Sequence, residues 1–214
     1  MPLLIEPVVP AGRMSGMPQP VLTVPAEDGP AGPTAAREPT ADGSAPRGEL
    51  ALRPWRADDA PALALAYQDP AIQRWHARSM DEAEAADWIR QRARRWSAET
   101  GADWAVTAGQ ALVARIGLRT VDLTEGHAEV AYWTLPVARG HGVAGRALRR
   151  LTRWCGAEVG LHRLELLHAV ENTASCRVAE KSGYRYEGTL RQAVPHADGF
   201  HDMHLHAHLG TDPI

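Results

Sequence analysis

The sequence predicts a mixed α/β fold in which helices cover a single sheet. Three strand-like segments follow one another in residues 104–135, and strands and helices then alternate up to a β-rich segment in residues 189–208. Strands that follow one another directly usually pair antiparallel, whereas a helix between two strands is typical of a parallel pair. The pattern changes at a glycine-rich turn in residues 139–145. Since both kinds of strand order occur, we expect a mixed sheet.

The helices are predicted from capping residues and from apolar side chains at helical spacing. Asp58 caps the first helix, which ends at Asp69 because Pro70 follows. Ser79, with Glu82 three residues later, forms a capping box for the second. The outer face of the second helix carries Arg90, Arg94 and Arg95, which we interpret as a solvent-exposed face, with a substrate-binding patch as the alternative.

The strands are predicted from apolar segments that glycines bound. The helix after the glycine-rich turn has apolar residues on one face, and a last helix begins after Asn172 and ends at Gly183. The predicted strands are residues 50–55, 104–107, 112–121, 128–135, 164–170, 189–192 and 202–208, and the two later helices are residues 143–155 and 173–182.

The domain organisation follows from a shift in composition. Ten of the 16 prolines fall in residues 1–48, so we expect a low-complexity, mostly irregular leader there that buries little surface. Residues 21–24 are a candidate edge strand within it. One domain is predicted over residues 49–209, and residues 210–214 form a short tail.

Composition excludes several classes of function. A net charge of −3 over 214 residues provides no basic surplus for nucleic acid. The sequence contains no apolar segment of the roughly 20 residues that span a bilayer, so no membrane partner is expected. The two cysteines, Cys155 and Cys176, are too few for a disulfide framework. A cytoplasmic protein with reduced thiols is therefore expected.

The glycine-rich turn Arg139-Gly140-His141-Gly142-Val143-Ala144-Gly145 predicts a phosphate site. Glycines let the backbone approach a phosphate, and the free N–H groups and dipole of the following helix attract an anion. Arg139 adds a planar set of donors. The spacing also fits a dinucleotide-binding motif, but that motif follows the first strand of a Rossmann domain, with further βαβ units beyond it. The β-rich end of this chain argues against that alternative.

Two motifs together resemble the GNAT superfamily of N-acetyltransferases. Arg139-x-x-Gly142-x-Ala144 is similar to its pyrophosphate loop, and residues 172–184 (NTASCRVAEKSGY) resemble an element of the ribosomal-protein N-terminal acetyltransferase-like (RimJ/RimL-type) branch. Residues 131–133, 161–163 and 187–191 match that branch as well. The resemblance implies a largely antiparallel sheet that splays at its fourth strand and is flanked by helices.

The resemblance also implies acetyl-CoA as co-substrate and direct acetyl transfer to a primary amine. The pantetheine arm would pair with the fourth strand, and the glycine-rich turn would hold the pyrophosphate. Asn172 would cap its helix and bond to the arm. The residues implied in cofactor binding are Trp133, Thr134, Leu135, Arg139, Gly140, His141, Gly142, Val143, Ala144, Gly145, Asn172 and Ser175.

The catalytic candidates are a base for the amine and an acid for the departing thiolate. Many members of the family place a tyrosine acid where this chain has Ala179, so the branch implies Ser175 instead. Glu129 is the first candidate for the base, because burial next to the splay would raise its pKa toward the useful range. Glu165 and His168 are the alternatives.

The last strand carries histidines at alternating positions, His204, His206 and His208, which therefore share one face. Three imidazoles on one face are a potential zinc site, but we interpret them as solvent-facing or substrate-lining and predict no metal. Cys176 is interpreted as a buried packing residue.

The acceptor stays open between a protein N-terminus and a small-molecule amine. Another acyl group, such as succinyl, and a non-catalytic acyl-CoA-binding sensor are the alternatives for function. The resemblance also implies a possible homodimer.

Overall fold

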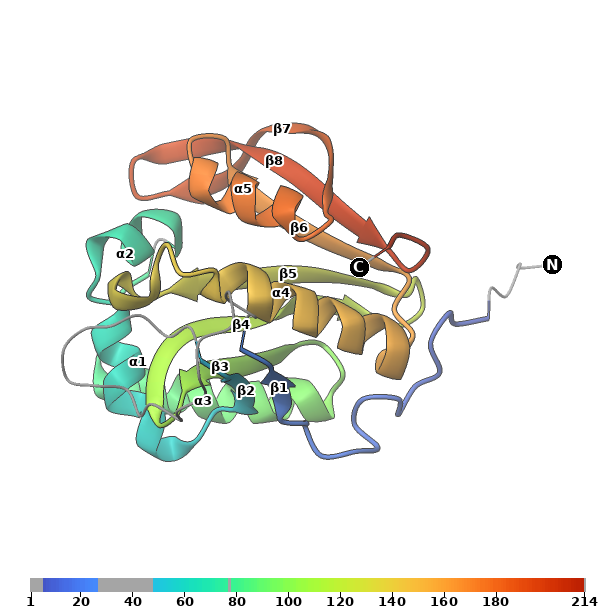
Figure 1. Cartoon of the computed structure of the whole chain (residues 1–214), viewed down its shortest axis with the longest axis horizontal. Coiled ribbons are helices and arrows are strands. Elements are labelled where there is room, and N and C mark those ends of the chain that lie inside the picture. The colour runs from blue at the N-terminus through green and yellow to red at the C-terminus, as the bar shows by residue number, and fades with distance from the viewer. Residues whose placement is uncertain (1–5, 27–47, 77, 214) are drawn as a thin grey trace, which may run out of the picture.

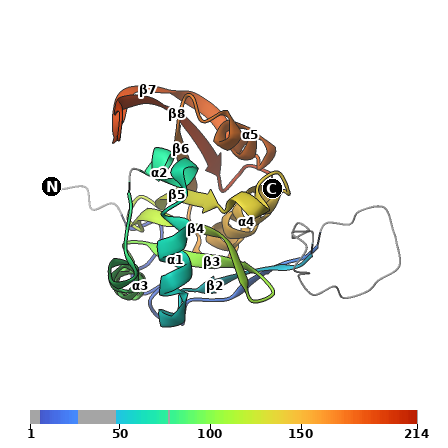
Figure 2. The ribbon, with the colours of Figure 1, turned by 90° about the vertical axis from the view of Figure 1, so that its left-hand side faces the viewer.

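A computed structural model describes residues 6–26, 48–76 and 78–213 of the chain. Its described residues form one eight-stranded sheet with helices on both faces (Figures 1 and 2). The helices are α1 (Ala60–Ala66), α2 (Pro70–His76), α3 (Glu82–Ser97), α4 (Val143–Trp154) and α5 (Thr173–Lys181). The strands are β1 (Leu22–Val24), β2 (Leu50–Pro54), β3 (Ala102–Ala108), β4 (Ala111–Asp122), β5 (His127–Thr134), β6 (Arg163–Ala169), β7 (Arg185–His196) and β8 (Gly199–Leu209).

The sheet is mixed and largely antiparallel, as the sequence predicts. Its strand order is β1-β2-β3-β4-β5-β6-β8-β7, and only the β5–β6 pair among the described strands is parallel. The parallel pair falls where α4 connects two strands, because a parallel neighbour needs a long crossover. The fourth of the strands predicted after the leader is β5, and here the sheet splays.

The two faces of the sheet carry different helices. Side chains alternate between faces along a strand. On β5, Trp133 packs with α1 and α3, whereas Ala128 and Val130 belong to the main core with α4. Figure 2 shows α1 and α3 on one side of the sheet and α4 and α5 on the other. A residue's position along β5 therefore decides which face its side chain reaches.

Three helix predictions need correction. Asp58 does not cap α1, whose N-cap residue is Asp59. The capping box of α3 is formed by Asp81 and Glu84, whose side chains and backbone N–H groups bond reciprocally at 2.8 and 2.9 Å, and not by Ser79 and Glu82. Asp69-Pro70 ends α1, as predicted, but Pro70 also begins the additional helix α2. Proline fits the first position of a helix, because the N–H that it lacks has no partner there.

Part of the proline-rich leader belongs to the main core. Val9 and Met14 are buried, and β1 pairs antiparallel with β2 as the sheet's edge strand. The Glu99 carboxylate accepts hydrogen bonds of 2.7–2.9 Å from three backbone N–H groups in residues 12–15, which secures the irregular segment. The candidate edge strand at residues 21–24 is thus confirmed. The expectation that the leader buries little surface is wrong for residues 9–24.

No helix among the described residues has both the length and the apolarity to cross a bilayer.

Candidate active site

A cleft opens where β5 and β6 separate. The two strands pair only from His127–Arg163 to Val130–Leu166, although β5 continues to Thr134 and β6 to Ala169. Beyond this point β6 pairs with β8 alone. The cleft has a volume of about 580 Å³, and side chains from both faces of the sheet line it. The splay therefore opens a passage between the two faces.

The open edge of β5 includes only one of the three residues predicted to pair with the pantetheine arm. The N–H of Leu135 donates to Val113 on β4 (2.9 Å), and its carbonyl accepts from Ala138 (2.9 Å), so both groups are already used. Successive residues of a strand present their backbone groups to opposite edges. The carbonyls of Tyr132 and Thr134 accordingly face away from β4. Of the predicted set, only Thr134 faces the open edge, and Tyr132, which is outside that set, faces it as well.

The carbonyls on this edge have side-chain partners. Nε2 of His76, at the end of α2, lies 3.2 Å from the carbonyl oxygen of Tyr132, and Arg139 Nε donates to Thr134 (3.0 Å). Burial, with a smaller contribution from the Arg115 charge, lowers the pKa of His76 to about 4. The imidazole is therefore neutral near pH 7 and donates this bond as an N–H group.

The glycine-rich turn has the geometry of an anion site. Gly140 and Gly142 have φ angles of 77° and 72°, in the left-handed region that favours glycine, and a Cβ added at Gly140 would meet open space. Gly142 provides no side-chain cap to α4, so the N–H groups of its first turn, at Val143, Ala144 and Gly145, stay available.

Arg139 is held beside this turn by Asp69. Its Nη2 donates to Asp69 Oδ1 (2.7 Å), and its side chain is 40% exposed, which leaves further guanidinium donors facing solvent. Burial opposes ionisation of Asp69, but hydrogen bonds from Arg139 and from the N–H of Ile72 outweigh it and lower the pKa of the carboxyl. The ion pair therefore orients Arg139.

The motif in residues 172–184 contributes the first turn of α5 to the cleft. Asn172 caps α5, with its Oδ1 accepting from the Ser175 N–H at 3.2 Å. The Ser175 hydroxyl lies 2.8 Å from the hydroxyl of Tyr132, across the cleft on β5. Burial raises the pKa of Tyr132 to about 12. Ala179 is fully buried in the core, away from the cleft lining.

Glu129 lines the cleft on the opposite face of β5 from Tyr132. Its carboxylate is 20% exposed and pairs with Arg119 (3.2 Å). Glu165 is its register partner on β6, but it pairs with Arg163 (2.8 Å) and does not line the cleft. His168 lines the cleft but lies on the α5 face of β6. Of the three base candidates, only Glu129 combines a place in the cleft with the face that α1 and α3 cover.

The wall of the cleft below α3 is strongly basic. Five arginines line it, and Glu129 is the only carboxylate residue among the described lining residues. Arg115 contacts the fully buried carboxylate of Asp103, which Arg92 also pairs with at 3.2 Å. Contrary to prediction, Arg95 is not a freely solvated residue, since it bonds to the carbonyl oxygen of Thr100 at 2.7 Å and lines this wall.

The histidines of the last strand are not solvent-facing. His206 and His208 are buried, and His204 is half-buried. Cys176 is half-buried and faces His206, with Sγ 3.8 Å from Nε2, so the prediction that it is a buried packing residue is also wrong. The sequence predicted the shared face of the histidines but not what covers it, because α5 and β8 are joined only by tertiary packing.

A family model described as an acetyltransferase (GNAT) domain matches residues 49–185. The chain belongs to the GNAT acetyltransferase family. The match covers the cleft residues of β5 and α5 and the glycine-rich turn before α4, while β8 lies beyond it.

Relatives of this GNAT chain include the ribosomal-protein-serine acetyltransferase of Escherichia coli, which is 29% identical over 46% of the chain and 55% of that protein. YdaF of Bacillus subtilis is 30% identical over 54% of the chain. The matched part of the chain spans only 60% of the length of YdaF and 55% of the length of the Escherichia coli protein.

Solved structures share the fold of this GNAT chain. RimL, a ribosomal L7/L12 α-N-protein acetyltransferase in complex with coenzyme A, superposes with a TM-score of 0.71 at 18% identity, covering 75% of this chain and 93% of that one. RimJ of Mycobacterium smegmatis, with a CoA disulfide, gives 0.70 at 24% identity, covering 77% and 83%.

Proposed function

We propose that this chain transfers an acetyl group from acetyl-CoA directly to a primary amine. The observation that carries the proposal is the cleft through the splayed sheet, with a carboxylate on one face and a hydroxyl pair on the other. A thioester entering from the α4–α5 face would meet an amine entering from the face of α1 and α3. Membership of the GNAT family supports this reading.

The residues of the turn and of the open strand edge fit an acyl-CoA. The N–H groups at the start of α4 and the free donors of Arg139 suit the pyrophosphate, since helix N-termini and guanidinium groups bind phosphate oxygens. The backbone of Tyr132 and Thr134 suits the amides of the pantetheine arm, which would continue the sheet at the splay. Acetyl-CoA supplies the activated acyl group.

Two proton transfers are needed, one from the amine and one to the thiolate, and different cleft residues are proposed for each. Glu129 is the proposed base, acting directly or through one water on the ammonium of the acceptor. Ser175 is the proposed acid for the departing thiolate. Tyr132 is protonated at neutral pH and lies within hydrogen-bond distance of Ser175, so it can pass a proton to Ser175 through their hydrogen bond.

The acceptor that suits this cleft is an amine with a negative charge close by. Even after Asp103 offsets one arginine, the wall keeps a surplus of positive charge, which attracts anions and repels polyamines. The named relatives act on ribosomal proteins. We therefore favour the N-terminal amine of an acidic protein segment over a polycationic small molecule.

Calorimetric titration of acetyl-CoA, with NADH as control, tests the cofactor. We expect acetyl-CoA alone to bind, and Arg139→Ala to weaken it by about tenfold, the loss of one charge-assisted hydrogen bond. Absence of binding to the wild-type protein would refute the proposal.

Initial rates on three acceptors then test the amine. These are a peptide with a free N-terminus followed by glutamates, the same peptide with lysines, and spermidine. We expect the acidic peptide to react fastest, with an advantage that falls as salt rises.

A non-catalytic acyl-CoA sensor is the alternative, and binding without turnover on any of these amines would favour it. The Tyr132–Ser175 hydrogen bond argues for the enzyme instead, because a sensor has no use for a proton donor there. We also propose a cytoplasmic location, which the free thiols of Cys155 and Cys176 support. The homodimer stays a prediction, which light scattering would test.

A further inference from the structure

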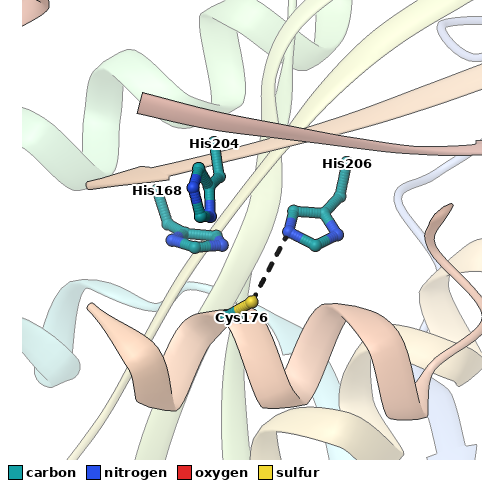
Figure 3. Close-up of side chains that lie close together, drawn as sticks. All are labelled: His168, Cys176, His204 and His206. Atoms are coloured by element: carbon teal, nitrogen blue, oxygen red, sulfur yellow. Dashed lines mark hydrogen bonds between the residues drawn. The ribbon is translucent and has the colours of Figure 1, made fainter. Parts of the chain in front are cut away.

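Four metal-ligating side chains converge next to the cleft. His168 on β6, Cys176 on α5, and His204 and His206 on β8 each offer one ligand atom, and these atoms all lie within 4.8 Å of one another. Figure 3 shows the three imidazoles on the strands and the thiol on the helix below them pointing into one common space. The alternation of side chains along β8 accounts only for His204 and His206 sharing a face. The approach of His168 and Cys176 depends on the packing of β6 and α5 against that face.

The hydrogen bonds of the imidazoles leave ligand nitrogens free. His168 Nδ1 lies 2.8 Å from the carbonyl oxygen of Ala169, which leaves Nε2 as the lone-pair atom. His206 Nδ1 lies 3.4 Å from the carbonyl oxygen of Tyr184, and its Nε2 faces Cys176. A carbonyl that fixes the tautomer in this way is the usual second partner of a metal-bound histidine.

Two nitrogens in the cluster are buried without a hydrogen-bond partner among the described residues: His168 Nε2 and His204 Nδ1. A buried polar atom with no partner costs free energy, and native proteins contain few of them. A bound cation would satisfy these nitrogens.

The chemistry of the four donor atoms favours Zn²⁺ over Mg²⁺ and Ca²⁺. Three imidazole nitrogens and one sulfur, with no carboxylate among the four, are unsuited to Mg²⁺ and Ca²⁺ and suited to Zn²⁺. Zinc–nitrogen and zinc–sulfur bonds of about 2.1 and 2.3 Å place tetrahedral ligands roughly 3.5 Å apart. The 3.8 Å between Cys176 Sγ and His206 Nε2 already approaches this spacing, and the remaining contacts need side-chain shifts of about an ångström.

We propose that His168, Cys176, His204 and His206 bind one Zn²⁺ ion that ties the first turn of α5 to β6 and β8. Four protein ligands complete the tetrahedral coordination of the ion, so the site is structural and leaves no coordination position for a substrate. Binding replaces the thiol proton of Cys176 with the metal, and the proton passes to solvent. Since Ser175 precedes Cys176, the ion also fixes Ser175 opposite Tyr132. As a ligand, His168 is no longer available as a base.

Metal titration of the full chain, stripped with a chelator, tests this site with Zn²⁺ and Co²⁺ as probes. We expect one ion per chain, a higher Tm with Zn²⁺ but not with Mg²⁺, and a Co²⁺ spectrum with tetrahedral visible bands and a thiolate charge-transfer band. Cys176→Ser is expected to weaken Zn²⁺ binding by at least about 100-fold, the upper end of what a lost second-shell partner costs. It should also abolish the charge-transfer band.

Cys155→Ala is the matched control, because Cys155 is the other free thiol and lies outside the cluster. We expect it to keep stoichiometric binding. His204→Gln, at the half-exposed ligand, provides a second variant should Cys176→Ser not fold, and it too should lose binding. Failure of the wild-type chain to bind Zn²⁺ at one equivalent, or binding that both ligand variants leave unchanged, would overturn the proposal. None of these readouts depends on acetyl transfer.

Discussion

The hydroxyls of Tyr132 and Ser175 lie 2.8 Å apart and join β5 to α5 across the splay of the sheet. The two residues are 43 positions apart in the sequence, and each belongs to a different motif. The contact places a tyrosine hydroxyl from β5 beside the serine that we propose as the acid.

If the pair acts as one proton donor, its two members should not contribute independently. Ser175→Ala is expected to lower kcat by about 100-fold, the contribution of a general acid, with the KM for acetyl-CoA nearly unchanged. Tyr132→Phe should lower kcat as well. We expect the double variant to be little worse than Ser175→Ala alone, because removal of either member breaks the same relay. Losses that simply multiply would contradict a shared role.

Glu129 and Glu165 form a matched pair for testing the base. Their side chains are 20% and 21% exposed and each pairs with an arginine, but only Glu129 lines the cleft. Glu129→Gln should lower kcat/KM by about 100-fold and remove the rise of the rate with pH that a base produces. Glu165→Gln should keep both the rate and the profile. Equal losses of kcat/KM in the two variants would mean that the substitutions act by destabilising the sheet and not by removing a base.

His76 should make the fold sensitive to acid. Its pKa is lowered by burial from 6.5 to about 4, so between these values the unfolded chain binds a proton that the folded chain does not. The free energy of unfolding therefore falls as the pH drops from 6.5 toward 4, by about 3 kcal/mol at most.

His76→Gln, whose amide can still donate to the Tyr132 carbonyl, should reduce this fall. Urea unfolding of both proteins near pH 7 and near pH 4.5 measures the difference. His168 and His206 act with the same sign, but they are present in both proteins and cancel. An identical pH dependence in the two proteins would show that His76 is protonated without penalty.

Met14 and Met17 test whether the leader contributes to stability. Met14 is fully buried and Met17 is 37% exposed, although they are three residues apart. Met14→Ala should lower the free energy of unfolding by about 2–5 kcal/mol, the usual cost of a large-to-small change in a core. Met17→Ala should change it by less than about 0.5 kcal/mol. Comparable small effects in both would mean that residues 9–24 separate readily from the sheet.

Much of the fold could be predicted from local signals. The mixed sheet, the glycine turn before α4 and the Asn172 cap of α5 all follow from residues close together in the sequence. The burial of residues 9–24 could not be predicted, because the few apolar residues of the leader gain partners only from distant elements. Pro70 predicts the end of α1 but not the start of α2, because proline both ends and begins helices.

The finer geometry of the site depends on packing that spacing does not contain. Which backbone groups of residues 132–135 face the open edge depends on how β4 pairs with β5. The Tyr132–Ser175 contact and the cluster around Cys176 both need α5 to lie over β5, β6 and β8. A sequence pattern predicts which side chains share a face, but not what lies over that face.

The short ladder between β5 and β6 has a consequence for motion. Only four residue pairs, from His127–Arg163 to Val130–Leu166, join the half of the sheet that carries β7 and β8 to the other half. A ligand that hydrogen-bonds along the open edge would extend this junction and hold the two halves together. Hydrogen–deuterium exchange should therefore slow at the Tyr132 and Thr134 amides when acetyl-CoA is present, while the amides of β3 keep their rate.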